Sequence, residues 1–71
     1  MGRNTFIIPR APCGRILMKV GAKRVSAKAM DEFADLLTEI GMRISEKAVR
    51  IAKHAGRKTV QAEDIKLAAK D

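Results

Sequence analysis

Residues 26–56 read SAKAMDEFADLLTEIGMRISEKAVRIAKHAG, and this stretch decides the fold. Its apolar residues recur every three or four positions, at Met30, Phe33, Leu37, Ile40, Ile44, Ala48 and Ile51. This spacing keeps one face of an α-helix apolar along its whole length. Ser26 is a favoured N-cap residue and Gly56 a favoured helix terminator, so the pattern predicts one long helix between them.

A chain of 71 residues cannot cover so long a helix by itself. Chains of about this size bury only roughly 60% of their unfolded surface, and Cys13 is the single cysteine. Cys13 is expected to pack as a small hydrophobic residue, with a reactive thiol as the alternative. No run approaches the roughly 20 apolar residues that span a membrane, and no secretory signal is recognised. We therefore expect a soluble intracellular chain that gains stability by oligomerising.

The charge is strongly basic and unevenly distributed. Fifteen Lys and Arg against eight Asp and Glu give a formal net charge of +7. Residues 1–30 hold seven basic side chains and no acid, residues 31–39 hold four acids and no base, and residues 43–58 hold six basic side chains against Glu46. Such blocks are typical of polyanion binders. Because the chain has no Trp or Tyr for base stacking, duplex DNA held through its phosphates is the expected partner.

The segment before the long helix predicts an arm and a short helix. Residues 1–10 are expected to form an extended basic arm, since Pro9 and Pro12 disfavour helix in the residues that precede them. Pro12 suits the first turn of a short helix, and Gly21 suits its end.

The segment after the long helix predicts a loop and a last helix. Thr59 and Val60 are β-branched, which favours a short strand in the loop, and residues 62–70 have the apolar spacing of a short helix. Residues 11–71 are therefore predicted to form one all-α domain, with the order short helix, loop, long helix, loop, short helix.

Gly41 lies at the midpoint of the predicted long helix, where glycine costs about 1 kcal/mol relative to alanine. The close approach of a second helix would offset this cost, and a tolerated surface glycine is the alternative. We expect the helices of two copies to cross here. Their shared core would be formed by Phe33, Leu37, Ile40, Gly41 and Ile44.

Two predicted loops hold the residues that best suit a phosphate ligand, and each leads into a helix N-terminus. They are Arg24, Val25 and Ser26 in one loop, and Lys58, Thr59 and Val60 in the other. A helix N-terminus offers unpaired N–H groups and partial positive charge, and a neighbouring basic side chain or hydroxyl adds to both. No metal-ligand cluster, glycine-rich phosphate loop or nucleophile with a positioned base is present, so no enzyme, metal site or cofactor is expected.

His54 lies three residues after Ile51, on the same helical face. It is expected either to be a surface histidine at a helix C-terminus or to contact Asp64 of another subunit in an end-to-end interface. In the second case protonation of His54 would favour the larger assembly. Arg57 and Asp64 flank the last loop, and we expect them to form an ion pair that fixes it.

Four segments make the sequence resemble an archaeal histone. They are APCGRI (residues 11–16), GAKRVS (21–26), AKHAGRKT (52–59) and AEDIKLA (62–68). The similarity covers roughly residues 9–70. It implies the histone fold, in which the long central helices of two copies cross in a handshake homodimer. It also implies a chromatin protein located on the chromosome, in the cytoplasm.

The resemblance implies DNA contacts at both loops and at Arg15, which corresponds to an arginine that enters the minor groove. The full set expected to contact DNA is Arg15, Lys23, Arg24, Val25, Ser26, Arg57, Lys58, Thr59, Val60 and Gln61. Gly21 matches a small residue that lets successive turns of an assembly stack, although Lys19 and Lys23 replace acids of some relatives and weaken the case for stacking. Dimers would join into tetramers and longer assemblies through Ile51, His54 and Asp64.

The expected function is that of an architectural chromatin protein. It would bind double-stranded DNA with little sequence specificity, and wrap, bend and compact it in the manner of a nucleosome. Co-assembly with a paralogous histone stays open, and no membrane or small-molecule partner is expected. The alternative is a histone-fold subunit of a heterodimeric transcription or repair complex. A helix-turn-helix regulator is disfavoured because the central helix is too long.

Overall fold

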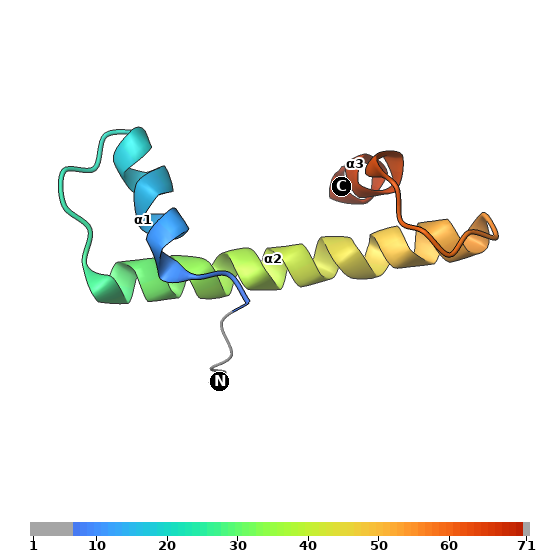
Figure 1. Ribbon diagram of the computed structural model, residues 1–71, viewed down its shortest axis with the longest axis horizontal. Coiled ribbons are helices and arrows are strands. Elements are labelled where there is room, and N and C mark those ends of the chain that lie inside the picture. Colours follow the sequence, from blue (N-terminus) through green and yellow to red (C-terminus); the bar gives the residue numbers. More distant parts are fainter. Residues whose placement is uncertain (1–6, 71) are drawn as a thin grey trace. The chain divides into compact units, whose positions relative to one another are not determined.

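A computed structural model describes residues 7–70 of the chain. Three α-helices follow one another: α1 (Arg10–Lys19), α2 (Ala27–His54) and α3 (Ala62–Ala69) (Figure 1). They are joined by a first loop, residues 20–26, and a second loop, residues 55–61. The predicted all-α class and its short–long–short order are confirmed, whereas most of the predicted arm lies outside the described residues. The described residues divide into two compact units, one that ends at residue 39 and one that begins at residue 40.

In the first unit, α1 packs on the first half of α2 through small residues. Cys13 is fully buried, as expected, and Gly14 is buried against Met30. A Cβ atom added to Gly14 would lie 2.5 Å from Met30 Sδ, so a larger residue would require the end of the Met30 side chain to move. The Arg10 guanidinium also donates two hydrogen bonds to the Asp31 carboxylate, each 2.9 Å long. This ion pair was not expected from the sequence.

The ends of α1 and α2 lie where capping chemistry predicts. Pro12 is the third residue of α1, within its first turn. Ser26 Oγ accepts a hydrogen bond of 3.0 Å from Ala29 N–H, which confirms it as the N-cap of α2. Gly21 and Gly56 follow the two helices with φ of +116° and +74°. At each glycine, two backbone N–H groups donate to carbonyl oxygens of the last helical turn, which is the Schellman pattern.

In the second unit, α3 packs on the second half of α2, again through small residues. Ala48, Ala52 and Ala68 are buried. Lys47 Nζ donates a hydrogen bond of 3.4 Å to the Ala68 carbonyl at the end of α3. The short strand predicted at Thr59 and Val60 is wrong, since the second loop has no strand. A strand needs a neighbouring backbone to pair with, and no segment of the described chain pairs with this loop.

Within residues 7–70, the core of the single chain contains no large apolar side chain. Its buried apolar residues are Cys13, Ala34, Ala48, Ala52 and Ala68. The large residues of the apolar stripe on α2 stay half-buried, and Ile40 is 45% exposed. Large apolar side chains contribute most of the stability gained by burial. The fold of the single chain leaves most of that contribution unrealised. No helix within residues 7–70 is long and apolar enough to cross a membrane.

Candidate nucleic-acid interface

The first loop presents basic side chains at the N-terminus of α2. Lys23, Arg24 and Ser26 are exposed, and Val25 is half-buried. Because Ser26 Oγ satisfies the Ala29 N–H, the N–H groups earlier in the first turn are the ones suited to a phosphate oxygen. The geometry therefore combines two full positive charges with the partial charge of a helix N-terminus.

The second loop presents Lys58, Thr59, Val60 and Gln61 ahead of α3, and all four are exposed. Arg57 stabilises the conformation of this loop through its side chain. Its guanidinium donates to the Thr59 carbonyl at 3.0 Å, and its Nη1 and Nη2 donate to Oδ2 and Oδ1 of Asp64 at 3.0 and 2.9 Å. The expected ion pair between Arg57 and Asp64 is therefore present, and it spans the loop.

Asp64 is 3% exposed, and its charge is satisfied from two sides. Besides the bonds from Arg57, Asp64 Oδ2 accepts a hydrogen bond of 2.8 Å from the Gln61 N–H. The Arg57 hydrogen bonds, followed by the Gln61 N–H, lower the pKa of Asp64 to about 2. The same pairing raises the pKa of Arg57. Both groups stay charged at neutral pH. The guanidinium of Arg57 is already engaged in three hydrogen bonds within the loop, so its main role is to stabilise the loop and not to bind a ligand.

Arg15 and Gly21 belong to the first unit, together with the first loop. Arg15 is exposed on α1, where its guanidinium is accessible to a ligand. A Cβ atom added to Gly21 would meet nothing within 4 Å, so in the single chain the glycine is required for its positive φ and not for space. Its role in stacking turns remains a prediction.

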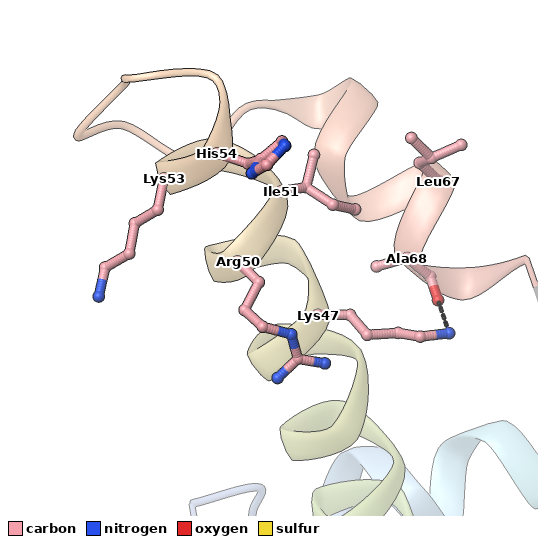
Figure 2. Close-up of a pocket in the computed structure, with 7 residues that line it drawn as sticks. All are labelled: Lys47, Arg50, Ile51, Lys53, His54, Leu67 and Ala68. Carbon is pink, nitrogen blue, oxygen red and sulfur yellow. Dashed lines mark hydrogen bonds between the residues drawn. The ribbon is translucent and has the colours of Figure 1, made fainter.

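The residues predicted to join dimers are separated in the single chain. Ile51 and His54 line an open groove of about 730 Å³ between the end of α2 and α3, the His54 groove (Figure 2). Its other lining residues are Lys47, Arg50, Lys53, Leu67 and Ala68. Asp64 does not line this groove, because it is buried under the second loop with both oxygens bonded to Arg57.

The predicted dimer core lies on an incompletely covered face of α2. Phe33, Leu37, Gly41 and Ile44 are half-buried, and Ile40 is exposed. A Cβ atom added to Gly41 would meet nothing within 4 Å, so no neighbour within the chain requires a glycine there. An intermolecular neighbour and a tolerated surface glycine both remain compatible with this geometry.

Metal-binding chemistry is not indicated by the geometry. Across the part of the chain that the structure describes, no group of three or more His, Cys, Asp or Glu residues is placed to hold an ion. The arrangement offers instead two exposed basic loops, each attached to a helix N-terminus, and such loops suit phosphate groups along a nucleic-acid backbone.

Comparisons with known proteins connect these features to a family. Residues 7–69 match the family model described as histone-like transcription factor (CBF/NF-Y) and archaeal histone. Probable archaeal histone 3 of Methanocaldococcus jannaschii is 56% identical over 61 residues, which cover 86% of this chain and 91% of that protein. A subunit of the archaeal histone HAN1 of Thermococcus zilligii is 48% identical over 63 residues, which cover 89% of this chain and 94% of that protein.

A third relative is more distant and longer. DNA-binding protein HmvA of Methanocaldococcus jannaschii is 38% identical over 60 residues, which cover 84% of this chain and 62% of that protein. The resemblance inferred from the four sequence segments is confirmed, and the three helices have the order that the histone fold requires. The chain belongs to the histone-fold family of archaeal histones and histone-like transcription factors.

Proposed function

We propose that this chain is an architectural protein of the chromosome, acting in the cytoplasm, that wraps, bends and compacts duplex DNA. The observation that carries the proposal is the pair of exposed basic loops, each placed at a helix N-terminus, on a chain with a net charge of +7. Family membership supplies the coarser statement: the chain is a DNA-binding chromatin protein that dimerises through its histone fold, and it is not an enzyme.

Binding would rest mainly on phosphates. Lys23, Arg24 and Lys58 supply positive charge, and the N-termini of α2 and α3 supply N–H donors for phosphate oxygens. Arg15 would enter the minor groove, as arginines of histone octamers do without reading individual bases. Sequence preference should therefore be small and should follow the ease of bending the DNA.

The binding unit would be a homodimer in which two α2 helices cross near Gly41. Support comes from the uncovered stripe on α2, where Ile40 is 45% exposed. In such a crossing the first loop of one copy lies beside the second loop of the other, so the two basic loops form one surface. The second loop would then find a neighbouring backbone that it lacks in the single chain.

Dimers would join through the His54 groove into tetramers or longer assemblies. Ile51 supplies an apolar contact, and exposed His54 supplies a polar contact to Asp64 of the next dimer. Asp64 Oδ1 accepts one hydrogen bond from Arg57, and a carboxylate oxygen accepts two. Gly21 would allow successive turns of a longer assembly to approach.

Nuclease digestion of the protein bound to long random-sequence DNA tests wrapping. Protected fragments that rise in regular steps indicate open-ended assembly, and one protected length indicates a closed particle. DNA that is digested as fast as the free duplex would overturn the proposal. Ile51→Ala and His54→Ala should shorten the protected fragments to those of the dimer while leaving dimerisation in solution unchanged.

The alternative is a component of a heterodimeric histone-fold complex. Two findings favour it: a relative is named as one of the subunits of HAN1, and the family description includes transcription factors. The oligomeric state of the purified chain separates the two functions. A stable homodimer that binds random DNA supports the architectural role, whereas a monomer that binds DNA only after a second histone-fold chain is added supports the heterodimeric role.

A further inference from the structure

The His54 groove has a basic lining that contains no acid. Its basic and titratable residues are Lys47, Arg50, Lys53 and His54, and all four are exposed. The rest of the lining is apolar, so no Asp or Glu lies in the groove. The two ion pairs found within residues 7–70 involve none of these four side chains. The positive charge of the groove is therefore not compensated by acids of the described chain.

Two of these cations, Lys47 and Arg50, lie close to the face of α2 that is predicted to join dimers. With 3.6 residues per turn, Lys47, Ile51 and His54 fall within about 60° of the helix surface. Arg50 lies about 40° from His54. Figure 2 shows the Lys47 side chain turned toward α3, where it donates a hydrogen bond to a carbonyl, whereas Lys53 extends away from α3. A molecule that docks on Ile51 and His54 therefore comes close to Lys47 and Arg50.

Identical dimers that join through this groove would bring like charges together. A joint between two identical surfaces has two-fold symmetry, so residues near its axis approach their own copies. Lys47 and Arg50 of both copies then place four positive charges in one interface. A contact to Asp64 of the neighbouring dimer does not offset them, because Arg57 already compensates the charge of Asp64. Like charges that meet at an interface weaken the complex.

We propose that the His54 groove binds an acidic counterpart in preference to its own copy. The partner that fits is a histone-fold dimer with Asp or Glu at the positions that correspond to Lys47 and Arg50. Opposite charges then face each other around the apolar contact made by Ile51 and Leu67. This inference rests on the proposed joining of dimers through the groove and names the partner that the groove selects. Identical dimers have to rely on the apolar contact and on DNA that holds them together.

A single charge reversal tests the repulsion. In a joint of two copies, Arg50→Glu changes the summed charge of positions 47 and 50 from +4 to zero. It should therefore strengthen tetramer formation at least about tenfold at low salt, where exposed charges are least screened. Lys28→Glu is the matched control, because it changes the net charge equally at an exposed position outside the groove. It should leave tetramer formation unchanged. Sedimentation equilibrium without DNA measures both variants.

A mixing experiment tests the choice of partner. The acidic-groove variant carries Lys47→Glu and Arg50→Glu, and each substitution lowers the charge by two. Its formal net charge falls from +7 to +3, so it does not attract the wild type as a whole molecule. Each chain alone should stay dimeric at concentrations at which an equimolar mixture forms tetramers. Native mass spectrometry should find both chains in every tetramer, and the tetramers should dissociate as the salt concentration rises.

Ile51→Ala tests whether the joint lies at the His54 groove. Introduced into both chains, it should abolish the mixed tetramers and leave the dimers intact. Mixed tetramers that persist would place the attraction elsewhere and overturn the assignment to this groove. Circular dichroism checks that the acidic-groove variant is folded. If it is not, Arg50→Glu decides the question, because this variant keeps the hydrogen bond from Lys47 to α3.

The outcomes distinguish this inference from the proposed function. A wild-type chain that forms tetramers as readily as the mixture, or Arg50→Glu chains that join no more strongly than the wild type, overturn the preference for an acidic counterpart. The proposed function then stands if the DNA fragments protected by the wild type still shorten with Ile51→Ala. A wild-type chain that joins neither on DNA nor in the mixture overturns both the joining of dimers and the choice of partner.

Discussion

Asp64 determines the shape of the second loop at the level of a single residue. Its carboxylate receives three hydrogen bonds, two from the Arg57 guanidinium and one from the Gln61 N–H, and its side chain is 3% exposed. A buried carboxylate is stable only when its charge is compensated in this way. The loop conformation that presents Lys58 and Thr59 therefore depends on a residue that a DNA ligand need not touch.

The lowered pKa of Asp64 predicts a stability contribution that depends on pH. The ordinary pKa of aspartate is about 3.9, and Arg57 lowers that of Asp64 to about 2 in the folded chain. Because the folded state favours the ionised form, the contribution is complete above about pH 4 and is lost as the pH falls through about 2. Asp64→Asn should lower the melting temperature by on the order of 5–10 °C at pH 7.

Thermal melts between pH 2 and 7 check this expectation. The difference in melting temperature between wild type and Asp64→Asn should become smaller as the pH falls from about 4 toward 2. Glu63→Gln is the matched control, because Glu63 is the neighbouring acid in the first turn of α3 and is exposed. A difference in melting temperature that stays constant over the whole pH range would contradict a stabilising contribution from the ionised Asp64 carboxylate.

At the level of helices, Gly14 of α1 packs against the Met30 side chain of α2. Gly14→Ala gains about 1 kcal/mol of helix propensity, but its methyl group would lie 2.5 Å from Met30 Sδ. Overpacking of a rigid core costs about 1–3 kcal/mol, but the atoms contacted here belong to the flexible end of a half-buried methionine that can move aside, so we expect a net change of less than about 1 kcal/mol. Urea unfolding at fixed protein concentration measures it. Adding Met30→Ala should make the Gly14→Ala substitution more favourable than it is in the wild-type background, and equal effects in both backgrounds would contradict the contact.

The space around Gly41 is open, unlike that around Gly14, and Gly41 therefore gives a different prediction. No atom lies within 4 Å of a Cβ added to it, so the single chain would accept a larger residue. If two α2 helices cross there, Gly41→Leu should weaken dimerisation at least about tenfold, since both copies place the new side chain at the axis. Sedimentation equilibrium measures this change. Glu39→Leu, at an exposed position on the opposite side of α2 from Gly41, is the control, and equal effects of the two would make Gly41 a surface glycine.

Helix ends could be predicted from the sequence, whereas contacts between helices could not. Ser26, Gly21 and Gly56 act on backbone groups within a few residues, so their roles follow from local capping chemistry. The contacts of Arg10 with Asp31 and of Lys47 with the Ala68 carbonyl each join residues 21 positions apart. No local pattern indicates such a pair. The strand prediction failed for a related reason, because β-propensity alone supplies no pairing partner.

The candidate site was predictable where charge and resemblance agreed. The ion pair of Arg57 with Asp64 was predicted from two opposite charges that flank the last loop, and it is present in the structure. The predicted grouping of Ile51, His54 and Asp64 depends on a second dimer. A single chain therefore shows two of these residues in the His54 groove and the third under the loop.

At the scale of the whole molecule, the two loops should act as one phosphate-binding surface of the dimer. Each phosphate contact that is lost lowers the slope of log affinity against log salt concentration by about 0.9. A substitution in a homodimer removes two contacts, so Arg24→Ala and Lys58→Ala should each lower the slope by about 2. Because these residues hold phosphates and not bases, affinity should fall equally on DNA of different sequences.

Fluorescence titrations of two unrelated duplexes at several salt concentrations measure both quantities. Lys66→Ala is the matched control, because it removes the same charge from an exposed position of α3 outside the two loops. Its smaller effect on the slope would separate a direct contact from the general field of a basic protein. If Lys66→Ala lowers the slope as much as the loop variants do, or if the loop variants weaken binding to one duplex only, the loops are not the phosphate-binding surface.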